Sequence, residues 1–299
     1  MRDEEALDKR RQAGKIAGLA RDYGKRLVKP GASLLDVAEK IEEFILSHNV
    51  GIGFPAQISR NVIAAHYCPG PGDETVFEKG DLVKVDVGTE IDGYIADTAT
   101  TVNLGEHDKL LRASRDALNN AIKIVKPGVT LGEIGKVVGE TIGALGFKPI
   151  RNLSGHGVGQ YKVHTSPSIP NFDTGGTTTL HDGQVIAIEP FASTGAGLVS
   201  DLPDCEIFMQ EAKKPVRNII TRAVLKEIEK YNGLPFTTRW LVKKFPLGKV
   251  QYALRDLHAQ GIINNYPPLA DRGGGIVSQA EHTIIVGEKS EVVTKTDVE

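Results

Sequence analysis

The sequence predicts an α/β (α+β) protein that arose by internal duplication around a pseudo-twofold axis, with a helical subdomain inserted in its second half. Three observations predict this class. A helix, a Lys-Pro-Gly break and a second helix occur twice, 97 positions apart. Each pair of helices is followed by strands in which a glycine precedes an acidic residue by six positions, at Gly80 and Asp86 and again at Gly183 and Glu189. A basic, mainly helical segment then interrupts the second half.

The first half begins with two predicted helices. Apolar residues recur at helical spacing from Asp3 to about Val28, where Lys29-Pro30-Gly31 ends the pattern. Ser33 is a typical N-cap for the next helix, whose apolar residues run from Leu34 to Ile45. A segment rich in Gly, Pro and Asn then leads to the first strands.

The second half repeats this order from His107. Its first helix ends at Lys126-Pro127-Gly128, and Thr130 with Glu133 forms a capping box for the second, which extends to Leu145. Chance similarity of two unrelated helix-and-strand segments is the alternative, but several matched features in the same order favour duplication.

A predicted hairpin, residues 81–101, holds the first pair of candidate functional carboxylates. Asp92-Gly93 suits a two-residue turn, and pairing Ile91 with Tyr94 fixes the register. Asp86 and Asp97 then lie on one face in a diagonal relation across the two strands. Two like charges this close repel unless a proton or cation lies between them. The alternative is a hairpin with one ordinary solvated face, since Lys84 and Asp86 share one side of the strand.

The duplication predicts a second pair of carboxylates. Glu189 ends the run VIAIE, which is apolar on both faces and therefore typical of a buried strand. Ala280-Glu281 resembles Ala96-Asp97 at the start of a strand from Ser278 to Val286. The pseudo-twofold axis would bring Asp86, Asp97, Glu189 and Glu281 together, where a buried carboxylate needs a metal or another partner.

Histidines complete a candidate metal site. His156 lies between glycines in Ser154-Gly155-His156-Gly157, His164 follows eight positions later, and His66 precedes the hairpin. A single loop histidine usually has no ligand role. One His with two Asp and two Glu, however, is an oxygen-rich set that suits two ions of Mn, Fe, Co or Zn bridged by carboxylates. Such a pair can hold a hydroxide nucleophile and polarise a carbonyl.

Composition limits the other possibilities. The 299 residues include 40% hydrophobic and 25% charged residues, and no run approaches the ~20 apolar residues of a membrane span. The N-terminal residues are charged and lack the apolar region of a secretory signal, and two cysteines provide no disulfide framework. We therefore expect a cytoplasmic protein without a membrane partner, and a monomer.

The inserted segment is residues 210–272, and the catalytic domain is predicted to comprise residues 1–209 and 273–299. The insert carries twelve Lys and Arg against five Asp and Glu, a net charge of +7, which leaves −9 for the remainder. Helices are predicted at 216–231, 237–244 and 248–260, followed by the strand-like IINNYPPLAD. This order is winged-helix-like. The net positive charge of the insert would attract polyanions. The alternative is that its lysines only keep the helix surfaces hydrated and that the insert forms a wall of the substrate cleft.

These residues together resemble the methionine aminopeptidases over nearly the full length. Asp86, Asp97, His156, Glu189 and Glu281 match that family's ligands in order and spacing. The insert of roughly sixty residues is similar to that of the type 2 branch, and the short N-terminus is similar to its archaeal form. The resemblance implies a "pita-bread" fold, two divalent ions (Co, Mn, Fe or Zn), and removal of the N-terminal methionine of nascent polypeptides with a small second residue.

The resemblance also implies a role for each residue. Asp86 would chelate one ion, His156 and Glu189 the other, and Asp97 and Glu281 would bridge both. Glu189 would in addition shuttle a proton. The remaining implied residues contact the substrate: His66 and His164 by hydrogen bonds, and Phe54 as part of the methionine pocket.

Two other functions remain open at this stage. An X-Pro peptidase or creatinase shares the five ligands, but the 85 residues before Asp86 leave little room for that group's N-terminal domain. A catalytically inactive, nucleic-acid-binding relative would use the basic insert instead. If the chain is the enzyme, its substrates are nascent chains, which emerge from the ribosome. Because the ribosome surface is largely RNA phosphate, we expect the ribosome to be the partner of the basic insert.

Overall fold

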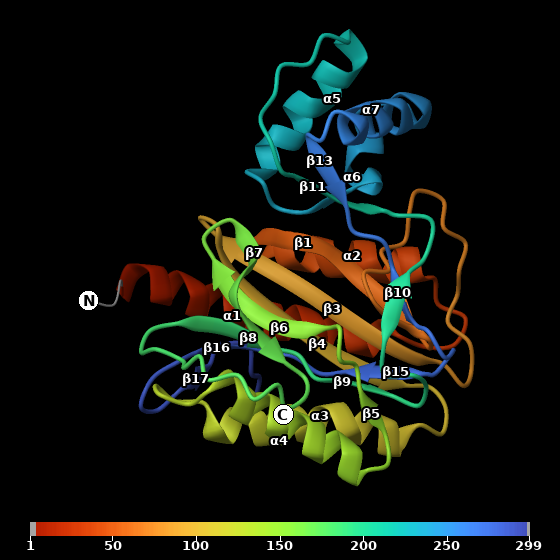
Figure 1. The fold of residues 1–299 in the computed structure, drawn as a ribbon. Coiled ribbons are helices and arrows are strands. Elements are labelled where there is room, and N and C mark those ends of the chain that lie inside the picture. The colour runs from red at the N-terminus through yellow and green to blue at the C-terminus, as the bar shows by residue number, and fades with distance from the viewer. Residues whose placement is uncertain (1–3, 298–299) are drawn as a thin grey trace.

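The computed structural model of the protein describes residues 4–297, and Figure 1 shows a two-part molecule. A body of sheets with helices on its outer sides carries a smaller helical subdomain, which projects from one end (Figure 1). Within residues 4–297, no helix is long and apolar enough to cross a membrane.

The first half of the body packs two helices against a three-stranded antiparallel sheet in the order β1-β3-β4. Its elements are α1 (Glu4–Leu27), α2 (Leu34–Ser47), β1 (Gly51–Arg60), β2 (Ile63–Ala65), β3 (Leu82–Ile91) and β4 (Tyr94–Asn103). The predicted first helix is confirmed from Glu4, and Asp3 lies outside the described residues. Ser33 caps α2 as predicted, because its hydroxyl accepts the N–H of Asp36.

The second half also begins with two helices that are followed by strands. Its elements before the insert are α3 (Asp108–Ile124), α4 (Leu131–Ala144), β5 (Lys148–Pro149), β6 (Ser154–Gly159), β7 (Lys162–Pro170), β8 (Val185–Ile188), β9 (Phe191–Ser193) and β10 (Val199–Asp201). Both parts of the Thr130–Glu133 capping box are present. Gly31 and Gly128 in the two Lys-Pro-Gly breaks have φ values of +86° and +87°, so the breaks share one backbone conformation.

After the insert the chain returns through β14 (Leu269–Asp271), β15 (Val277–Gln279), β16 (His282–Ile285) and β17 (Glu291–Val292). β16 pairs antiparallel with β8, as β4 pairs with β3 in the first half. The two strand pairs are therefore equivalent. The second lies in a five-stranded sheet of order β17-β16-β8-β6-β7, and β9, β10, the insert, β14 and β15 separate β8 from β16 in the chain. Each half has its own apolar core between its helices and its sheet.

The strand predicted from Ser278 to Val286 is wrong in one respect, because it is interrupted at Ala280 and Glu281. β15 joins one sheet and β16 another. At the interruption, the N–H of Glu281 donates to the carbonyl of Ala99 at 3.0 Å, and Thr98 Oγ1 donates to the carbonyl of Glu281 at 2.7 Å. The break therefore exists because this segment bonds across to β4 of the other half.

The hairpin β3–β4 has the predicted register, with Asp86 opposite Ala99 and Gly88 opposite Asp97. Asp92 and Gly93 both have positive φ, as the two-residue turn requires. The alternative of a solvated face is wrong. Lys84 is only 1% exposed, and its ammonium group donates to the carbonyl of Asn61 at 3.0 Å.

The inserted subdomain has a core of its own. Its elements are β11 (Ile207–Gln210), α5 (Ile219–Ile228), a 3₁₀ helix (Glu229–Tyr231), β12 (Phe236–Thr237), α6 (Thr238–Val242), α7 (Leu247–Ala259) and β13 (Ile263–Asn265). The three helices pack on the sheet β12-β11-β13 and follow one another in the predicted order along the chain. IINNYPPLAD is two strands, because β14 pairs with β2 and β10 of the body. We propose that the subdomain spans residues 207–265.

A buried ion pair fastens the insert to the body. The guanidinium group of Arg239 on α6 donates to both carboxylate oxygens of Glu42 on α2, at 2.7 and 2.9 Å. Its Nε donates to the carbonyl of Pro69, and Trp240 Nε1 also donates to Glu42. Such a bidentate pair fixes the orientation of both groups, and loss of one partner would leave a charge buried and unpaired.

We therefore expect Arg239→Met to lower the free energy of unfolding by about 3 kcal/mol or more, because Glu42 would keep its charge without its main partner. Urea titration followed by tryptophan fluorescence and circular dichroism measures the loss. Arg255→Met is the control, since Arg255 lies exposed on α7 of the same subdomain. Equal stability of the two variants would show that the pair does not fasten the insert.

Candidate functional site

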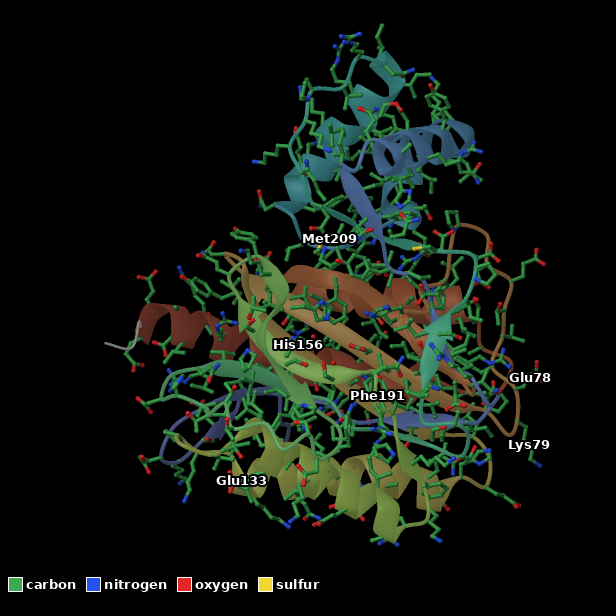
Figure 2. The ribbon with its side chains drawn as sticks, viewed as in Figure 1. Glu78, Lys79, Glu133, His156, Phe191 and Met209 are labelled. Carbon is green, nitrogen blue, oxygen red and sulfur yellow. The ribbon has the colours of Figure 1, made fainter. Side chains whose placement is uncertain are left out.

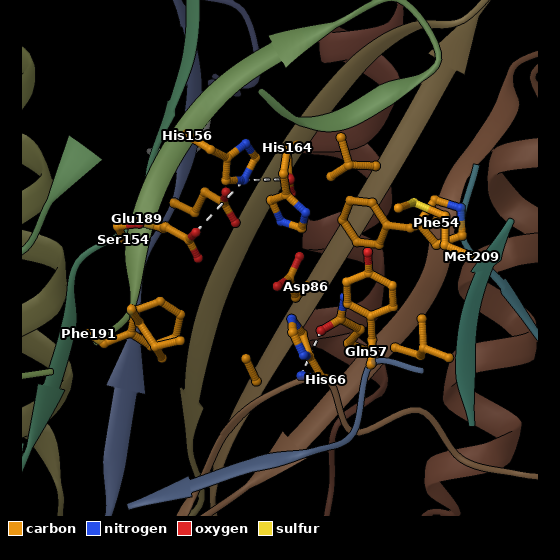
Figure 3. A pocket seen from close by; sticks show the side chains of 18 of the residues that line it. Phe54, Gln57, His66, Asp86, Ser154, His156, His164, Glu189, Phe191 and Met209 are labelled. Atoms are coloured by element: carbon orange, nitrogen blue, oxygen red, sulfur yellow. Dashed lines mark hydrogen bonds and ion pairs between the residues drawn. The ribbon is translucent and has the colours of Figure 1, made fainter. Parts of the chain in front are cut away.

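All eight predicted site residues line one cavity of about 210 Å³ between the two halves of the body and the insert. They are Phe54, His66, Asp86, Asp97, His156, His164, Glu189 and Glu281. Figure 2 places His156 near the centre of the molecule, below the insert. In Figure 3, His156 and Glu189 lie at one side of the cavity, Phe54 and Met209 lie at the other, and Asp86 is between them.

The four carboxylates are brought together by the two equivalent strand pairs, β3 with β4 and β8 with β16. Asp86 and Asp97 come from β3 and β4, Glu189 directly follows β8, and Glu281 directly precedes β16. Side chains of the neighbouring threonines hold this junction: Thr283 Oγ1 donates to the carbonyl of Asp97 at 2.8 Å. The predicted convergence of the two halves on one point is thus a consequence of how β4 and β16 are bonded to each other.

Burial makes this cluster unfavourable as four free anions. It raises the pKa of Asp86 to about 7. Burial, reinforced by repulsion from the neighbouring carboxylates, raises the pKa values of Asp97, Glu189 and Glu281 well above their usual range. The site therefore requires protons or cations between its oxygen atoms.

Unpartnered oxygen atoms favour cations. Asp86 Oδ1, Asp97 Oδ1 and Glu281 Oε1 are sealed from solvent and have no hydrogen-bond partner within the described chain. Buried polar atoms are almost always bonded, so these three oxygens fit a ligand role. Ligand atoms of Asp97, His156 and Glu281 also lie within 4.8 Å of one another. The donor set suits a divalent transition metal.

His156 has the tautomer that a metal ligand needs. Its Nδ1 lies 3.2 Å from the carbonyl oxygen of Gly157, which can only accept, so Nδ1 carries the proton. Burial lowers the pKa of His156 to about 3, which keeps the ring neutral. Nε2 therefore presents a lone pair, 3.6 Å from Asp97 Oδ2 and 3.8 Å from Glu189 Oε1. Both separations are too long for hydrogen bonds but suit atoms that share one ion.

Gln279 is a site residue that sequence reasoning missed. Its Nε2 lies 3.3 Å from both Asp86 Oδ2 and Glu189 Oε2, so it bridges carboxylates of the two halves. The side chain is 1% exposed. Its position two residues before Glu281 was the available signal, because alternate residues of a strand share a face.

The two accessory histidines lie at different places on the cavity wall. The ring of His164 on β7 packs edge-on against His156, with ring centroids 4.3 Å apart. His66 has a positive φ of 66° and lies in the loop after β2. Its Nδ1 is 3.3 Å from the carbonyl of Pro267. Loss of hydration lowers the pKa of His164 and lowers that of His66 to about 4.

The remaining wall is mostly apolar and comes partly from the insert and its junctions with the body. Besides Phe54, it includes Val163, Ile207, Met209, Pro235 and Tyr266. The last four are far from Phe54 in the sequence, and no motif marks them. Only their position in or beside the insert could have indicated them.

The chain matches a known family over most of its length. The model of metallopeptidase family M24 matches residues 8–231. A methionine aminopeptidase of Thermococcus onnurineus is 47% identical over 297 residues, which cover 98% of this chain and all of that protein. A methionine aminopeptidase of Archaeoglobus fulgidus is 44% identical over 98% of this chain and 99% of its own length.

Solved structures agree in fold. A methionine aminopeptidase of Thermotoga maritima superposes with a TM-score of 0.73 at 26% identity, over 98% of this chain and 97% of its own. A thermophilic Arx1 has a TM-score of 0.85 at 18% identity, over 98% of this chain and 94% of its own. The prolidase of Pyrococcus horikoshii has a TM-score of 0.63 at 20% identity, and only 64% of that chain is covered. The last two likenesses concern the fold alone, which is the predicted pita-bread α/β fold.

The raised pKa of Asp86 predicts a pH-dependent difference between the metal-free wild type and Asp86→Asn. Because the folded pKa of about 7 exceeds the usual 3.8, the stability contributed by protonated Asp86 is present below about pH 4 and is lost as the pH rises through 7. Asn resembles the protonated acid at every pH. In EDTA, the free energy of unfolding of Asp86→Asn, relative to that of wild type, should therefore rise by on the order of 3 kcal/mol between pH 4 and pH 8.

Urea unfolding at both pH values measures this difference, with the exposed Glu43→Gln as control. A saturating divalent cation should reverse the sign at pH 8, because the ionised wild type then gains a partner that Asn cannot replace. An Asp86→Asn difference that is the same at both pH values would contradict the burial of an uncompensated carboxylate.

Proposed function

We propose, since the chain belongs to metallopeptidase family M24 and to its methionine aminopeptidases, that it removes the initiator methionine of nascent proteins at a centre of two divalent cations. The observation that carries this proposal is the set of buried, unpartnered oxygens of Asp86, Asp97 and Glu281 in one cavity. The insert supports assignment to the type 2 branch in its archaeal form. The ions would be Co, Mn, Fe or Zn.

The five proposed metal ligands would have different roles. Asp86 would hold one ion, and His156 with Glu189 the other, while Asp97 and Glu281 would lie between the two. When bound, the ions supply positive charge that polarises the scissile carbonyl and lowers the pKa of a water molecule. The Glu189 side chain is 14% exposed, and its raised pKa suits a group that accepts and returns a proton at a carboxylate oxygen.

The two accessory histidines would act on the substrate. Both keep neutral rings near pH 7, because their pKa values are lowered, so each has one donor and one acceptor nitrogen. His164 beside His156 and His66 on the other wall could therefore hydrogen-bond the peptide from two sides. Donors aimed at a carbonyl oxygen stabilise the charge that develops in the transition state.

The cavity also supports the proposed specificity. Phe54 and Met209 lie together on the side opposite His156 and Glu189 and suit a methionine side chain (Figure 3). The ring of Tyr266 also lines the cavity and lies edge-on to His66, with centroids 6.1 Å apart. We expect a peptide whose first side chain fills the apolar side to place its second residue beside these two rings, which would exclude a large side chain.

The test is a set of short peptides assayed while the metal is titrated into metal-free enzyme. Met-Ala-Ser, Met-Gly and Met-Ser peptides should be cleaved after the first residue only. Met-Lys and Met-Phe peptides should be cleaved about 10²-fold less efficiently in kcat/KM, because the larger second side chain would collide with the rings of His66 and Tyr266.

An Ala-Pro peptide separates this proposal from the rival X-Pro peptidase. We expect no cleavage of it. Efficient release of a residue before proline, or activity that is unchanged by removal and return of the metal, would contradict the proposed function.

We further propose that the basic insert directs the enzyme to the ribosome surface in the cytoplasm. Its lysines at positions 213, 214, 243, 244 and 249 are exposed. Phosphate contacts weaken steeply with salt, so co-sedimentation with ribosomes should fall between low and moderate salt and should be lost on charge reversal of these five lysines. Reversal of Lys123, Lys126 and Lys136 on the body is the control. Binding that is indifferent to salt or to the insert's lysines would leave the insert as a wall of the cavity.

A further inference from the structure

The loop that carries His66 is fastened to β1 by two side chains and by one backbone bond, in which the N–H of Ile58 donates to the carbonyl of Tyr67 at 2.8 Å. The backbone N–H of His66 donates to Oε1 of Gln57 at 2.8 Å, and the next N–H, that of Tyr67, donates to Oγ of Ser59 at 3.3 Å. Gln57 and Ser59 are two positions apart on one strand, so their side chains leave it on the same face. Each side chain therefore holds a different residue of the loop.

Gln57 reaches His66 because of a bulge in β1. Phe54 faces Gly88 on β3 and Gln57 faces Asp86, so β1 takes three steps where β3 takes two. Bulges redirect side chains and occur beside active sites. Here the bulge places Gln57 next to Asp86 on the cavity wall, where it is 9% exposed.

His66 needs such a contact to keep its conformation. Its φ of +66° is uncommon for a residue other than glycine and persists only where the surroundings enforce it. Two bonds from different directions do so: Gln57 holds the backbone N–H, and the carbonyl of Pro267 contacts Nδ1 of the ring. Because a backbone N–H can only donate, the amide oxygen of Gln57 must face it. Figure 3 shows this bond beside Asp86.

We propose that Gln57 is a positioning residue, which sets the direction of the His66 imidazole in the cavity through its bond to the His66 backbone. The inference rests on the proposed function, in which His66 contacts the substrate. Without the acceptor, the Pro267 contact of the ring is the one bond of the two that remains, so the backbone of His66 can leave the positive-φ region and the ring then moves away from the peptide. A shift of about 1 Å in such a group can cost about 10²-fold in rate.

The test combines Gln57→Met with Ser59→Ala and His66→Ala, assayed on Met-Ala-Ser at saturating metal. Met keeps the length of Gln without its strong acceptor. We expect Gln57→Met to lower kcat about 10- to 100-fold, with KM and metal content nearly unchanged. Ser59→Ala removes the neighbouring loop bond and should stay within about threefold of wild type. In the His66→Ala variant, adding Gln57→Met should lower kcat by less than about twofold, because the imidazole that Gln57 positions is absent.

Three results would overturn the inference. The first is full activity of Gln57→Met, and the second is an equal loss of kcat from Gln57→Met with and without the His66 side chain. The third is an equal loss of kcat from Ser59→Ala, which would mean that the bonds only stabilise the loop. If Gln57→Met does not fold, Gln57→Asn is judged by the same criteria, because its amide is one methylene too short to reach His66. Failure of the proposed function gives a different result from failure of the positioning role. Either the wild type would not cleave the peptide, or His66→Ala alone would be fully active. Both results would also overturn the positioning role of Gln57.

Discussion

The structure depends on one electrostatic constraint, which is that four carboxylates with little access to water line a single cavity. Two come from each half of the duplicated body, and within residues 4–297 none of them forms an ion pair with a Lys or Arg side chain. Isolated buried charge is strongly unfavourable, so the cluster is stable only with positive charge or protons between its members. The raised pKa values and the unpartnered oxygens both result from that constraint.

The scaffold explains how the carboxylates stay in place despite their repulsion. Hydrogen bonds between β4 and the break before β16 join the two halves at Ala99 and Glu281. Gln279 spans the site and contacts Asp86 and Glu189 at once. The insert closes the cavity on the remaining side, and its attachment to α2 through Arg239 fixes the position of that wall. Rigidity at the junction is therefore what allows a shared ion site.

The sequence predicted the parts of the site that follow from local rules. Turn chemistry at Asp92-Gly93 determined the hairpin register, and with it the positions of Asp86 and Asp97. Repeated breaks and caps indicated the second half. The break in the strand at Glu281 and the burial of Lys84 could not be predicted, because both depend on bonds to residues distant in the chain. The same is true of Met209 and Tyr266, which reach the cavity only through the folded topology.

The most direct measurement of the central claim is the number of divalent ions that the folded chain holds. Metal-free protein would be loaded with Co²⁺ or Mn²⁺, freed of weakly bound metal by gel filtration, and analysed by mass spectrometry of the metal, while anomalous scattering from crystals locates the ions. The account predicts two ions per chain, both among Asp86, Asp97, His156, Glu189 and Glu281. A single ion, or ions bound elsewhere with these carboxylates left protonated, would contradict it.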